Sequence, residues 1–333
     1  MKVVIPVAGV GTRLRPHTYT QPKPLMPVAG KPIISFIIDK LVEAGLNDFV
    51  FVIGYLGDKI RDFIQETYPD LRTEFVYQEH REGSAHAIMT AREALEDEDA
   101  VFIAFGDTIF EVDLRQMLDC PGSCLALKKV TDPRDFGVAE SDEKGIVTRM
   151  VEKPRIPKSN LAMVGLYKVT DVPALLRAVD YLIANESRTM GEYQLTDALQ
   201  RMVEEGHHFQ TIVAQNWFDC GRKEVLLETN AMLLSQRGYA ANEFSLPEFD
   251  NTIFIHPVAV GTDCQIANSI IGPNVSIGDH ASIQYSIVRD SIIGNFAALK
   301  DVVLNRSVIG SDTTIHGMNL SLNIGDNTEI DFD

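Results

Sequence analysis

A glycine-rich loop with several cations follows the first apolar run of the chain. Residues 3–7 read as a short buried strand, and Gly9, Gly11, Arg13 and Lys23 come after it. Prolines spread through this loop prevent it from forming a helix. A glycine-rich turn after a strand exposes backbone N–H groups, and nearby cations add positive charge. The loop is therefore predicted to bind the oxygens of a polyphosphate.

Two well-known phosphate motifs do not fit this loop. The sequence lacks the Gly-Lys-Ser/Thr of a P-loop. The stretch 9–14 lacks the third glycine of a dinucleotide-binding fingerprint, and the second predicted strand, which ends near residue 53, lacks the ribose-binding acid. A crossover loop with accidental basic residues is the alternative interpretation. The ten-residue spacing of Arg13 and Lys23 within one long loop favours phosphate binding.

Acidic residues at the ends of predicted strands are candidates for metal binding. Asp107 lies just past the buried strand 101–105, where a carboxylate oxygen can hold a hard cation such as Mg²⁺. An aspartate that caps a turn or a helix is the alternative. Asp219 follows two aromatic residues, and on its own it would be an ordinary loop residue. Two carboxylates that are remote in sequence, both at strand ends, are compatible with a metal site, and the residues alone leave both interpretations open.

The pattern of apolar residues predicts the elements that position these side chains. Strands are predicted at 3–7, 49–53, 74–77 and 101–105, and helices at 32–44, 59–68 and 85–95. This order predicts a Rossmann-like parallel sheet with right-handed crossovers and flanking helices. Ligands of such sheets lie beyond the carboxyl ends of the strands, so the loops 9–23, 78–84 and 106–107 are expected to meet at one cleft.

The middle of the chain is richer in strands. They are predicted at 125–130, 136–139, 147–151, 163–169 and 209–213, with helices at 173–184, 195–205 and 224–236. The whole sheet is therefore expected to be mixed and mainly parallel, in a catalytic domain that spans residues 1–237.

The sequence changes character after residue 250. Apolar residues recur every five or six positions, often followed by glycine, and no helix has that period. Such a repeat predicts the coils of a parallel β-helix over residues 251–333, and a small antiparallel sandwich is the alternative. Because coils of this kind offer flat side faces and open ends, we expect a homo-oligomer.

Length and composition exclude several classes of protein. The 333 residues suffice for one large domain and a smaller one, and the net charge of −17 argues against a nucleic-acid partner. The sequence has no apolar run of about 18 residues, so no membrane span is predicted. Its start lacks the pattern of a secretory signal, and its four scattered cysteines do not form a disulfide scaffold, so we expect a cytoplasmic protein.

The stretch from Val7 to Pro32 resembles the signature of the sugar-1-phosphate nucleotidylyltransferases, which is roughly L-A-G-G-x-G-T-R-L-x-P-x-T-x(5)-K-x-L-x-P-V-x-x-K-P. Ala8 stands where many members have their first glycine, and the start Pro-Val-Ala-Gly resembles the bacterial UTP–glucose-1-phosphate branch. The resemblance implies the nucleotide-diphospho-sugar transferase fold. The tail resembles the left-handed parallel β-helix of hexapeptide-repeat proteins.

This resemblance also implies roles for individual residues. The implied nucleotide-binding residues are Ala8, Gly9, Gly11, Thr12, Gln78, Gly83 and Ser84, and the implied catalytic residues are Arg13, Lys23 and Lys153. Asp107 matches the family's Gly-Asp motif and Asp219 its Trp-x-Asp-x-Gly motif, and these two would hold Mg²⁺. The implied sugar-phosphate site contains Gly137, Glu152, Lys153, Asn160 and Val164. Met190 occupies the place of a phosphate-binding arginine, and Arg188 is the candidate replacement.

The reaction that the resemblance implies is an in-line attack by a sugar 1-phosphate on the α-phosphorus of a nucleoside triphosphate. The protein positions two anions and neutralises charge, and Mg²⁺ is the expected cofactor. The expected substrates are glucose 1-phosphate and either dTTP or UTP. GTP with mannose 1-phosphate is an alternative. A non-catalytic regulatory subunit is a third possibility, but it would be expected to have lost one of Arg13, Lys23, Asp107 and Asp219, all of which are present.

Overall fold

The computed structural model describes residues 1–236 and 249–330, which form two compact units. The first unit consists of Met1–Gly9 and Ile37–Trp217. The second consists of Val10–Phe36 together with the chain from Phe218 onward. The predicted domains, residues 1–237 and 251–333, divide the chain in sequence order, whereas the compact units group the glycine-rich loop with the C-terminal part.

A nine-stranded mixed sheet forms the centre of the first unit, as predicted. Its parallel half contains β1 (Lys2–Val7), β4 (Asp48–Ile53), β5 (Arg72–Tyr77) and β6 (Val101–Ala104). In this half β1 lies between β4 and β6, and β5 lies outside β4. Strands β1, β4 and β6 are almost entirely apolar because both faces of this half are covered.

The other half of the sheet is mostly antiparallel. It contains β8 (Ser123–Lys129), β9 (Gly137–Ser141), β10 (Val147–Glu152), β11 (Leu161–Val169) and β12 (Phe209–Val213). Strand β11 joins the halves because it pairs antiparallel with β6 and also with β8 and β9. The short strands β7 (Thr108–Glu111) and β13 (Asn216–Asp219) lie outside this sheet.

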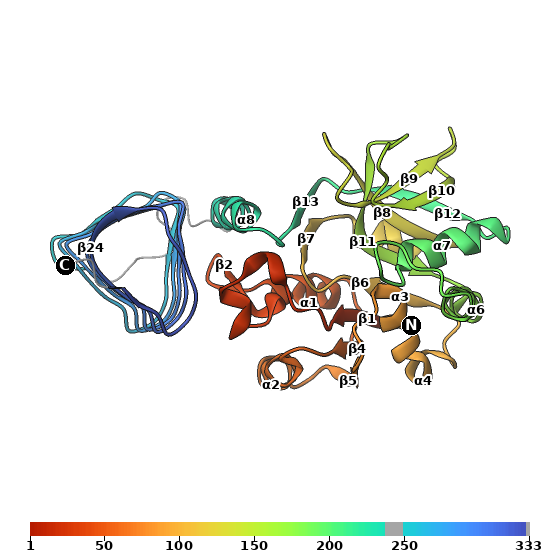
Figure 1. The fold of residues 1–333 in the computed structure, drawn as a ribbon, viewed down its shortest axis with the longest axis horizontal. Helices are drawn as coiled ribbons and strands as arrows, with labels where there is room; N and C mark the ends of the chain where they lie inside the picture. Colours follow the sequence, from red (N-terminus) through yellow and green to blue (C-terminus); the bar gives the residue numbers. More distant parts are fainter. Residues whose placement is uncertain (237–248, 331–333) are drawn as a thin grey trace. The chain divides into compact units, whose positions relative to one another are not determined.

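Helices cover the sheet. They are α1 (Ile33–Glu43), α2 (Gly57–Thr67), α3 (Ser84–Thr90), α4 (Arg92–Leu95), α5 (Leu114–Asp119), α6 (Val172–Ala184) and α7 (Leu195–Glu204). Helices α3, α6 and α7 pack together and share one apolar core with β1 and β4, and α6 and α7 lie next to each other in Figure 1. None of the helices described by the structure is both long and apolar enough to cross a bilayer.

The second unit begins with the glycine-rich segment, residues 10–36. Its prolines leave room only for the 3₁₀ turns Thr12–Leu14, His17–Tyr19 and Lys23–Leu25, and for the two-residue strands β2 (Pro27–Val28) and β3 (Lys31–Pro32). Helix α8 (Lys223–Gln236) belongs to the same unit.

A parallel β-helix follows, which confirms the predicted repeat and excludes the sandwich. Its strands are β14 (Ile253–Phe254), β15 (Val258–Val260), β16 (Gln265–Ala267), β17 (Ile270–Ile271), β18 (Val275–Ile277), β19 (Ser282–Gln284), β20 (Ile287–Arg289), β21 (Ile292–Ile293), β22 (Ala298–Asn305), β23 (Val308–Ile309), β24 (Thr314–Leu320), β25 (Asn323–Ile324) and β26 (Glu329–Ile330).

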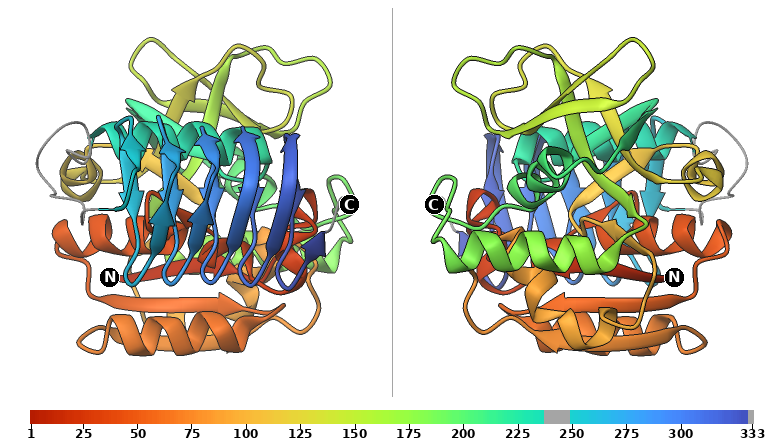
Figure 2. Two further views of the ribbon diagram at one scale, coloured as in Figure 1. Left: turned by 90° about the vertical axis from the view of Figure 1, so that its left-hand side faces the viewer. Right: turned by 90° about the vertical axis from the view of Figure 1, so that its right-hand side faces the viewer.

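The coils of the β-helix stack in close register. Ile266 pairs with Ile283, and Ile283 pairs with Leu299, so successive coils are 17 and 16 residues apart. Each coil has three sides, which is why apolar residues recur every five or six positions. Figure 1 views the coils end on as a triangle, and Figure 2 shows them stacked side by side.

Buried serines form hydrogen bonds with backbone N–H and C=O groups at the corners of these coils. The Ser269 hydroxyl oxygen accepts a hydrogen bond from the Ser286 backbone N–H at 3.1 Å, and the Ser286 hydroxyl oxygen accepts one from Val302 at 3.2 Å. Each hydroxyl also donates to a carbonyl two residues earlier. Because buried N–H groups need partners, these small polar residues let the chain turn inside an apolar core.

Candidate active site

The glycine-rich segment folds tightly around Gly11. This residue has φ 66°, and a Cβ there would lie 3.1 Å from both Lys23 Cβ and Thr18 Cγ2. The Thr18 hydroxyl donates to the Gly11 carbonyl at 2.9 Å. Only glycine adopts this conformation in so little space without strain. The turn leads directly into Thr12 and Arg13, both of which are exposed.

One carboxylate of the second unit holds the two predicted catalytic cations. Lys23 Nζ lies 3.2 Å from Asp219 Oδ1, and Arg13 Nη2 lies 3.3 Å from Asp219 Oδ2. The Lys23 side chain is only 8% exposed, whereas that of Arg13 is 50% exposed. A Cβ at Gly221 would lie 2.6 Å from Arg13 Nη2, so glycine leaves the room that the guanidinium needs. Two positive charges beside one negative charge suit the binding of an anion.

Asp107 follows β6 in the first unit. Thr108 donates a hydrogen bond from its hydroxyl to Asp107 Oδ1 at 3.3 Å. The preceding Gly106 passes so close to β1 that a Cβ there would lie 2.2 Å from Val7 Cγ1. Among the residues that the structure describes, no group of three or more acidic, histidine or cysteine side chains could hold a metal ion. Asp107 and Asp219 belong to different units.

The predicted nucleotide-binding residue Gln78 is buried and has a fixed orientation. Its Nε2 donates to the Gly83 carbonyl at 3.1 Å and lies 2.9 Å from His86 Nδ1. A carbonyl oxygen can only accept, so Nε2 must face Gly83, and His86 Nδ1 must then accept as well. Burial lowers the pKa of His86, although Glu82 opposes this shift. The lowered pKa favours the neutral imidazole, whose Nδ1 can accept a hydrogen bond.

An ion pair extends this network. Glu82 lies 3.7 Å from His86 Nε2, and its other carboxylate oxygen accepts a hydrogen bond from Arg188 at 2.8 Å. The Arg188 guanidinium lies 4.0 Å from the centre of the Tyr193 ring. The candidate replacement for the family arginine, Arg188, thus lies beside Glu82, in the segment that follows Gln78, while Met190 is 77% exposed.

Gly83 and Ser84 connect the segment that follows Gln78 to the start of α7. Gly83 has φ 111°, and a Cβ there would lie 2.4 Å from the Tyr193 carbonyl oxygen. The Ser84 hydroxyl oxygen accepts a hydrogen bond from Leu195 N at 2.8 Å and lies 3.3 Å from Gln194 Oε1. The Ser84 side chain is therefore engaged within the protein, and its backbone is the part that a nucleotide could contact.

Gly137, Glu152 and Lys153 come together around a buried carboxylate. The Thr196 hydroxyl donates to Glu152 Oε2 at 2.6 Å, and Lys153 Nζ lies 3.8 Å from Glu152 Oε1. Burial raises the pKa of Glu152, although the Thr196 hydrogen bond and Lys153 oppose the shift. A Cβ at Gly137 would lie 2.9 Å from Glu152 Oε2, so glycine keeps this space open.

The remaining predicted sugar-site residues lie on or beside β11. The backbone of Asn160 accepts a hydrogen bond from Val130 N at 2.9 Å, and Val164 is 1% exposed in the sheet. Sequence reasoning did not select Thr196 and Trp217 individually. Trp217 stacks edge-on against Phe136 with ring centres 4.6 Å apart, and its buried Nε1 has no partner among the described residues. Trp217 lies inside the Trp-x-Asp-x-Gly motif and Thr196 lies at the start of the predicted helix 195–205, and these were the available signals.

Comparison with known proteins identifies the family. The chain matches the family model described as nucleotidyl transferase over residues 2–236, and it belongs to that family. The predicted family and enzyme class are thereby confirmed.

Several relatives resemble the chain more specifically. It is 30% identical to a glucose-1-phosphate thymidylyltransferase of Streptomyces griseus over 332 residues, which covers 93% of this chain and 92% of that protein. It is 35% identical to the low-salt glycan biosynthesis nucleotidyltransferase Agl11 of Haloferax volcanii, over 71% of this chain and 67% of that protein. A solved structure of UDP-glucose pyrophosphorylase complexed with UDP-glucose matches with a TM-score of 0.62 and 25% identity, over 71% of this chain and 99% of that one.

A pH-dependent stability is expected from the buried His17. Burial lowers its pKa below the ordinary value of 6.5, despite a hydrogen bond to Asn323. Stability from this residue is complete above the unfolded pKa and is lost as the pH falls toward the folded pKa, by at most about 1.4 kcal/mol per pH unit. His17→Gln keeps an N–H donor but does not titrate. Its stability in urea should therefore fall less than that of the wild type between about pH 7 and about pH 5.

Other titrating groups are shared by the two proteins, so they cancel in this comparison. Equal pH dependence in wild type and His17→Gln would contradict the assignment.

Proposed function

We propose that this protein transfers a nucleotidyl group from dTTP or UTP to glucose 1-phosphate, releasing pyrophosphate and an NDP-glucose. The observation that carries the proposal is the pair of cations, Arg13 and Lys23, held on Asp219 in a segment that matches the family. Nucleotidyl transfer to a sugar 1-phosphate is also the chemistry named for the thymidylyltransferase relatives.

The proposed mechanism requires positioning and charge neutralisation. The sugar phosphate is already ionised, so it attacks the α-phosphorus in line without a protein nucleophile. Arg13 binds the triphosphate, Lys23 stabilises charge near the α-phosphate or the leaving pyrophosphate, and Lys153 binds the acceptor phosphate. Glu152 accepts hydrogen bonds from sugar hydroxyls. Each of these contacts counteracts repulsion between two anions.

We propose that Asp107 and Asp219 hold Mg²⁺. Their carboxylate oxygens are the hard ligands that this ion prefers, and Asp219 already lies among the triphosphate-binding cations. Bound there, Mg²⁺ would neutralise charge on the phosphates.

The fixed orientation of the Gln78 amide favours a nucleotide whose base presents an N–H donor to Oε1. Both hydrogen bonds described for this amide use Nε2, so Oε1 points away from Gly83 and can accept from a ligand. Uracil and thymine present an N3–H donor, and guanine presents an N1–H donor. Adenine and cytosine present an acceptor at the corresponding position, which would leave Oε1 facing a lone pair. This argument favours dTTP or UTP, keeps GTP with mannose 1-phosphate as the alternative, and disfavours ATP and CTP.

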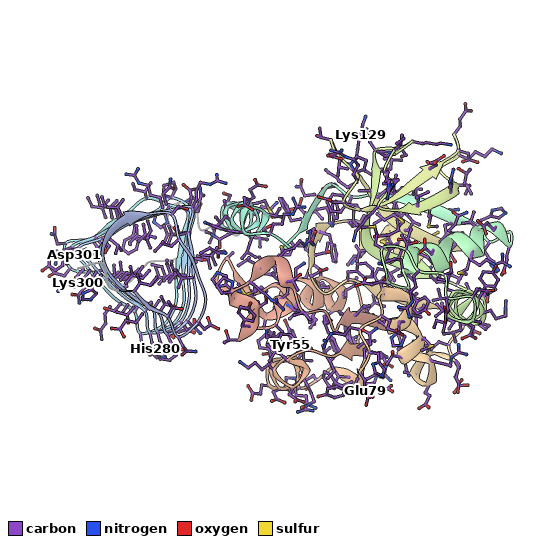
Figure 3. The ribbon with its side chains drawn as sticks, in the orientation of Figure 1. Tyr55, Glu79, Lys129, His280, Lys300 and Asp301 are labelled. Carbon is purple, nitrogen blue, oxygen red and sulfur yellow. The ribbon has the colours of Figure 1, made fainter. Side chains whose placement is uncertain are left out.

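We also propose self-association through the β-helix in the cytoplasm. Aromatic side chains lie exposed at its corners: Tyr285 is 57% and Phe296 is 55% exposed. Figure 3 labels His280 at the outer edge of the coils, and its ring stacks on Phe296 with centres 4.8 Å apart. Exposed aromatic surface of this kind favours a protein partner.

The substrate pair can be tested by measuring pyrophosphate release. The assay would combine dTTP, UTP, GTP, CTP and ATP with glucose 1-phosphate or mannose 1-phosphate in the presence of Mg²⁺. We expect release with glucose 1-phosphate and dTTP or UTP. Dominant activity with GTP and mannose 1-phosphate would support the alternative, and no release with any pair would support the regulatory subunit.

Replacement of single charged groups should abolish most turnover. Arg13→Ala and Asp107→Ala are each expected to lower kcat/KM by about 10²–10³ while the protein stays folded. Arg15→Ala is a matched control, because Arg15 lies in the same loop but its guanidinium stacks on Tyr19 at 4.9 Å. Near-normal turnover in Arg13→Ala or Asp107→Ala, or an equal loss in the control, would count against the assignment.

His86 should determine the preference between bases. In His86→Leu the Gln78 amide loses one of its two acceptors and is held only by the Gly83 carbonyl, so its orientation is less fixed and the ratio of kcat/KM for UTP over CTP should fall by about tenfold. In His86→Asn the Asn oxygen replaces Nδ1 as acceptor, and the ratio should stay close to that of the wild type. The interpretation fails if His86→Leu keeps the wild-type ratio.

A further inference from the structure

The glycine-rich segment is attached to the final coils of the β-helix. His17 is 3% exposed, and its Nε2 lies 2.6 Å from Asn323 Oδ1. The Thr20 hydroxyl donates to the Asp326 carboxylate. Each of these contacts joins residues 306 positions apart in the chain, and both lie within the second unit.

The coil surface under these contacts is closely fitted. A Cβ at Gly325 would lie 3.1 Å from Pro16 Cβ, so the backbone of the coil lies directly against the segment. Asp326 uses its other oxygen, Oδ1, to accept a hydrogen bond from Ser311 N at 2.8 Å. The turn that holds Thr20 is thus itself fixed to the preceding coil.

A second attachment lies at the other end of the segment. Asn230 of α8 is fully buried, and its Oδ1 accepts hydrogen bonds from Ala29 N and from the Ser276 hydroxyl, both at 2.8 Å. Its Nδ2 donates to the Asn274 carbonyl at 3.2 Å. One amide therefore links the segment and the second coil, and truncation of its side chain would leave several buried groups without partners.

Lys23 lies between these two attachments in the sequence, and Gly11 and Arg13 lie just before the first. Thr18, next to His17, is fully buried and donates to the Gly11 carbonyl, and Lys23 packs against Gly11. The segment contains only single 3₁₀ turns and two-residue strands, which supply few hydrogen bonds of their own. Its conformation must therefore depend on what it packs against.

We propose that the β-helix is a structural part of the nucleotide-binding loop, with Asn323, Asp326 and Asn230 as positioning residues for Arg13 and Lys23. The coils fix the loop before the ligand arrives, so the entropy of ordering is not lost on binding. That the loop binds a triphosphate rests on the proposed function. That the coils order the loop rests on the contacts alone.

A simpler interpretation is that these contacts only fasten the β-helix to the rest of the chain. The two interpretations differ in what a lost contact changes. Simple fastening predicts a lower melting temperature with unchanged substrate binding. Positioning predicts a looser loop and a selective rise in the KM for the nucleoside triphosphate.

The test uses full-length protein with Asn323→Ala, which removes the acceptor of His17. Hydrogen–deuterium exchange of the amides in residues 11–20 should rise by about tenfold, the effect of losing one hydrogen bond. In the pyrophosphate assay, the KM for the triphosphate should rise several-fold while the KM for the sugar phosphate stays unchanged. Asn323→Asp keeps an acceptor oxygen and should restore both values.

Asn295→Ala is the matched control. Asn295 lies in an earlier coil, and its Oδ1 accepts a hydrogen bond from Asp279 N at 3.0 Å, within the β-helix itself. This variant should lower stability without changing exchange in residues 11–20. Unchanged exchange in Asn323→Ala, or faster exchange with an unchanged KM for the triphosphate, would overturn the proposal. If the wild type released no pyrophosphate with any substrate pair, the proposed function would fail, but the exchange data would still decide whether the coils order the loop.

Discussion

The Asp219 carboxylate is the group on which the arrangement of the loop depends. Two cations brought close together repel each other, and the deeply buried Lys23 also loses most of its hydration. The Asp219 carboxylate contacts both side chains and offsets these costs, and Gly221 leaves space for the Arg13 guanidinium. The result is a preformed cationic surface with one net positive charge, ready for an anion that carries several negative charges.

The same loop shows how little of its order is local. Its prolines exclude helix, its glycine needs a left-handed backbone conformation, and its 3₁₀ turns are single. Order is therefore supplied by polar side chains of distant segments, namely the buried Asn230 and the more exposed Asn323 and Asp326. Such contacts are specific, because each buried group has to find its own partner. They explain why residues 10–36 form a compact unit with the C-terminal part of the chain.

Much of the fold could be predicted because long apolar patterns dominate it. The strands of the parallel half, the helices longer than ten residues and the β-helix all follow from periodicity. Short elements such as α5 and β7 were missed, and the predicted helix at 85–95 is two helices, α3 and α4, because segments of four to seven residues carry little periodic signal. The attachment at Asp326 could not be predicted. Asp326 resembles Asp279 in sequence. Asp279 accepts hydrogen bonds from Thr262 within the β-helix, whereas Asp326 also accepts one from Thr20 of the glycine-rich segment.

Arg188 illustrates what a motif can and cannot locate. The motif predicts an arginine near the sugar phosphate, and the chain offers one two residues away from the expected place. In the structure that arginine contacts Glu82 and Tyr193, at the segment that holds Gln78. An exposed ion pair is a weak constraint, and a phosphate is a stronger partner for a guanidinium than one carboxylate. The pairing with Glu82 is therefore compatible with the predicted role, and it would connect the predicted nucleotide-binding residues with the predicted sugar-phosphate site. Lys153 forms a comparable ion pair with Glu152, at 3.8 Å, and would exchange it in the same way for the predicted contact with an acceptor phosphate.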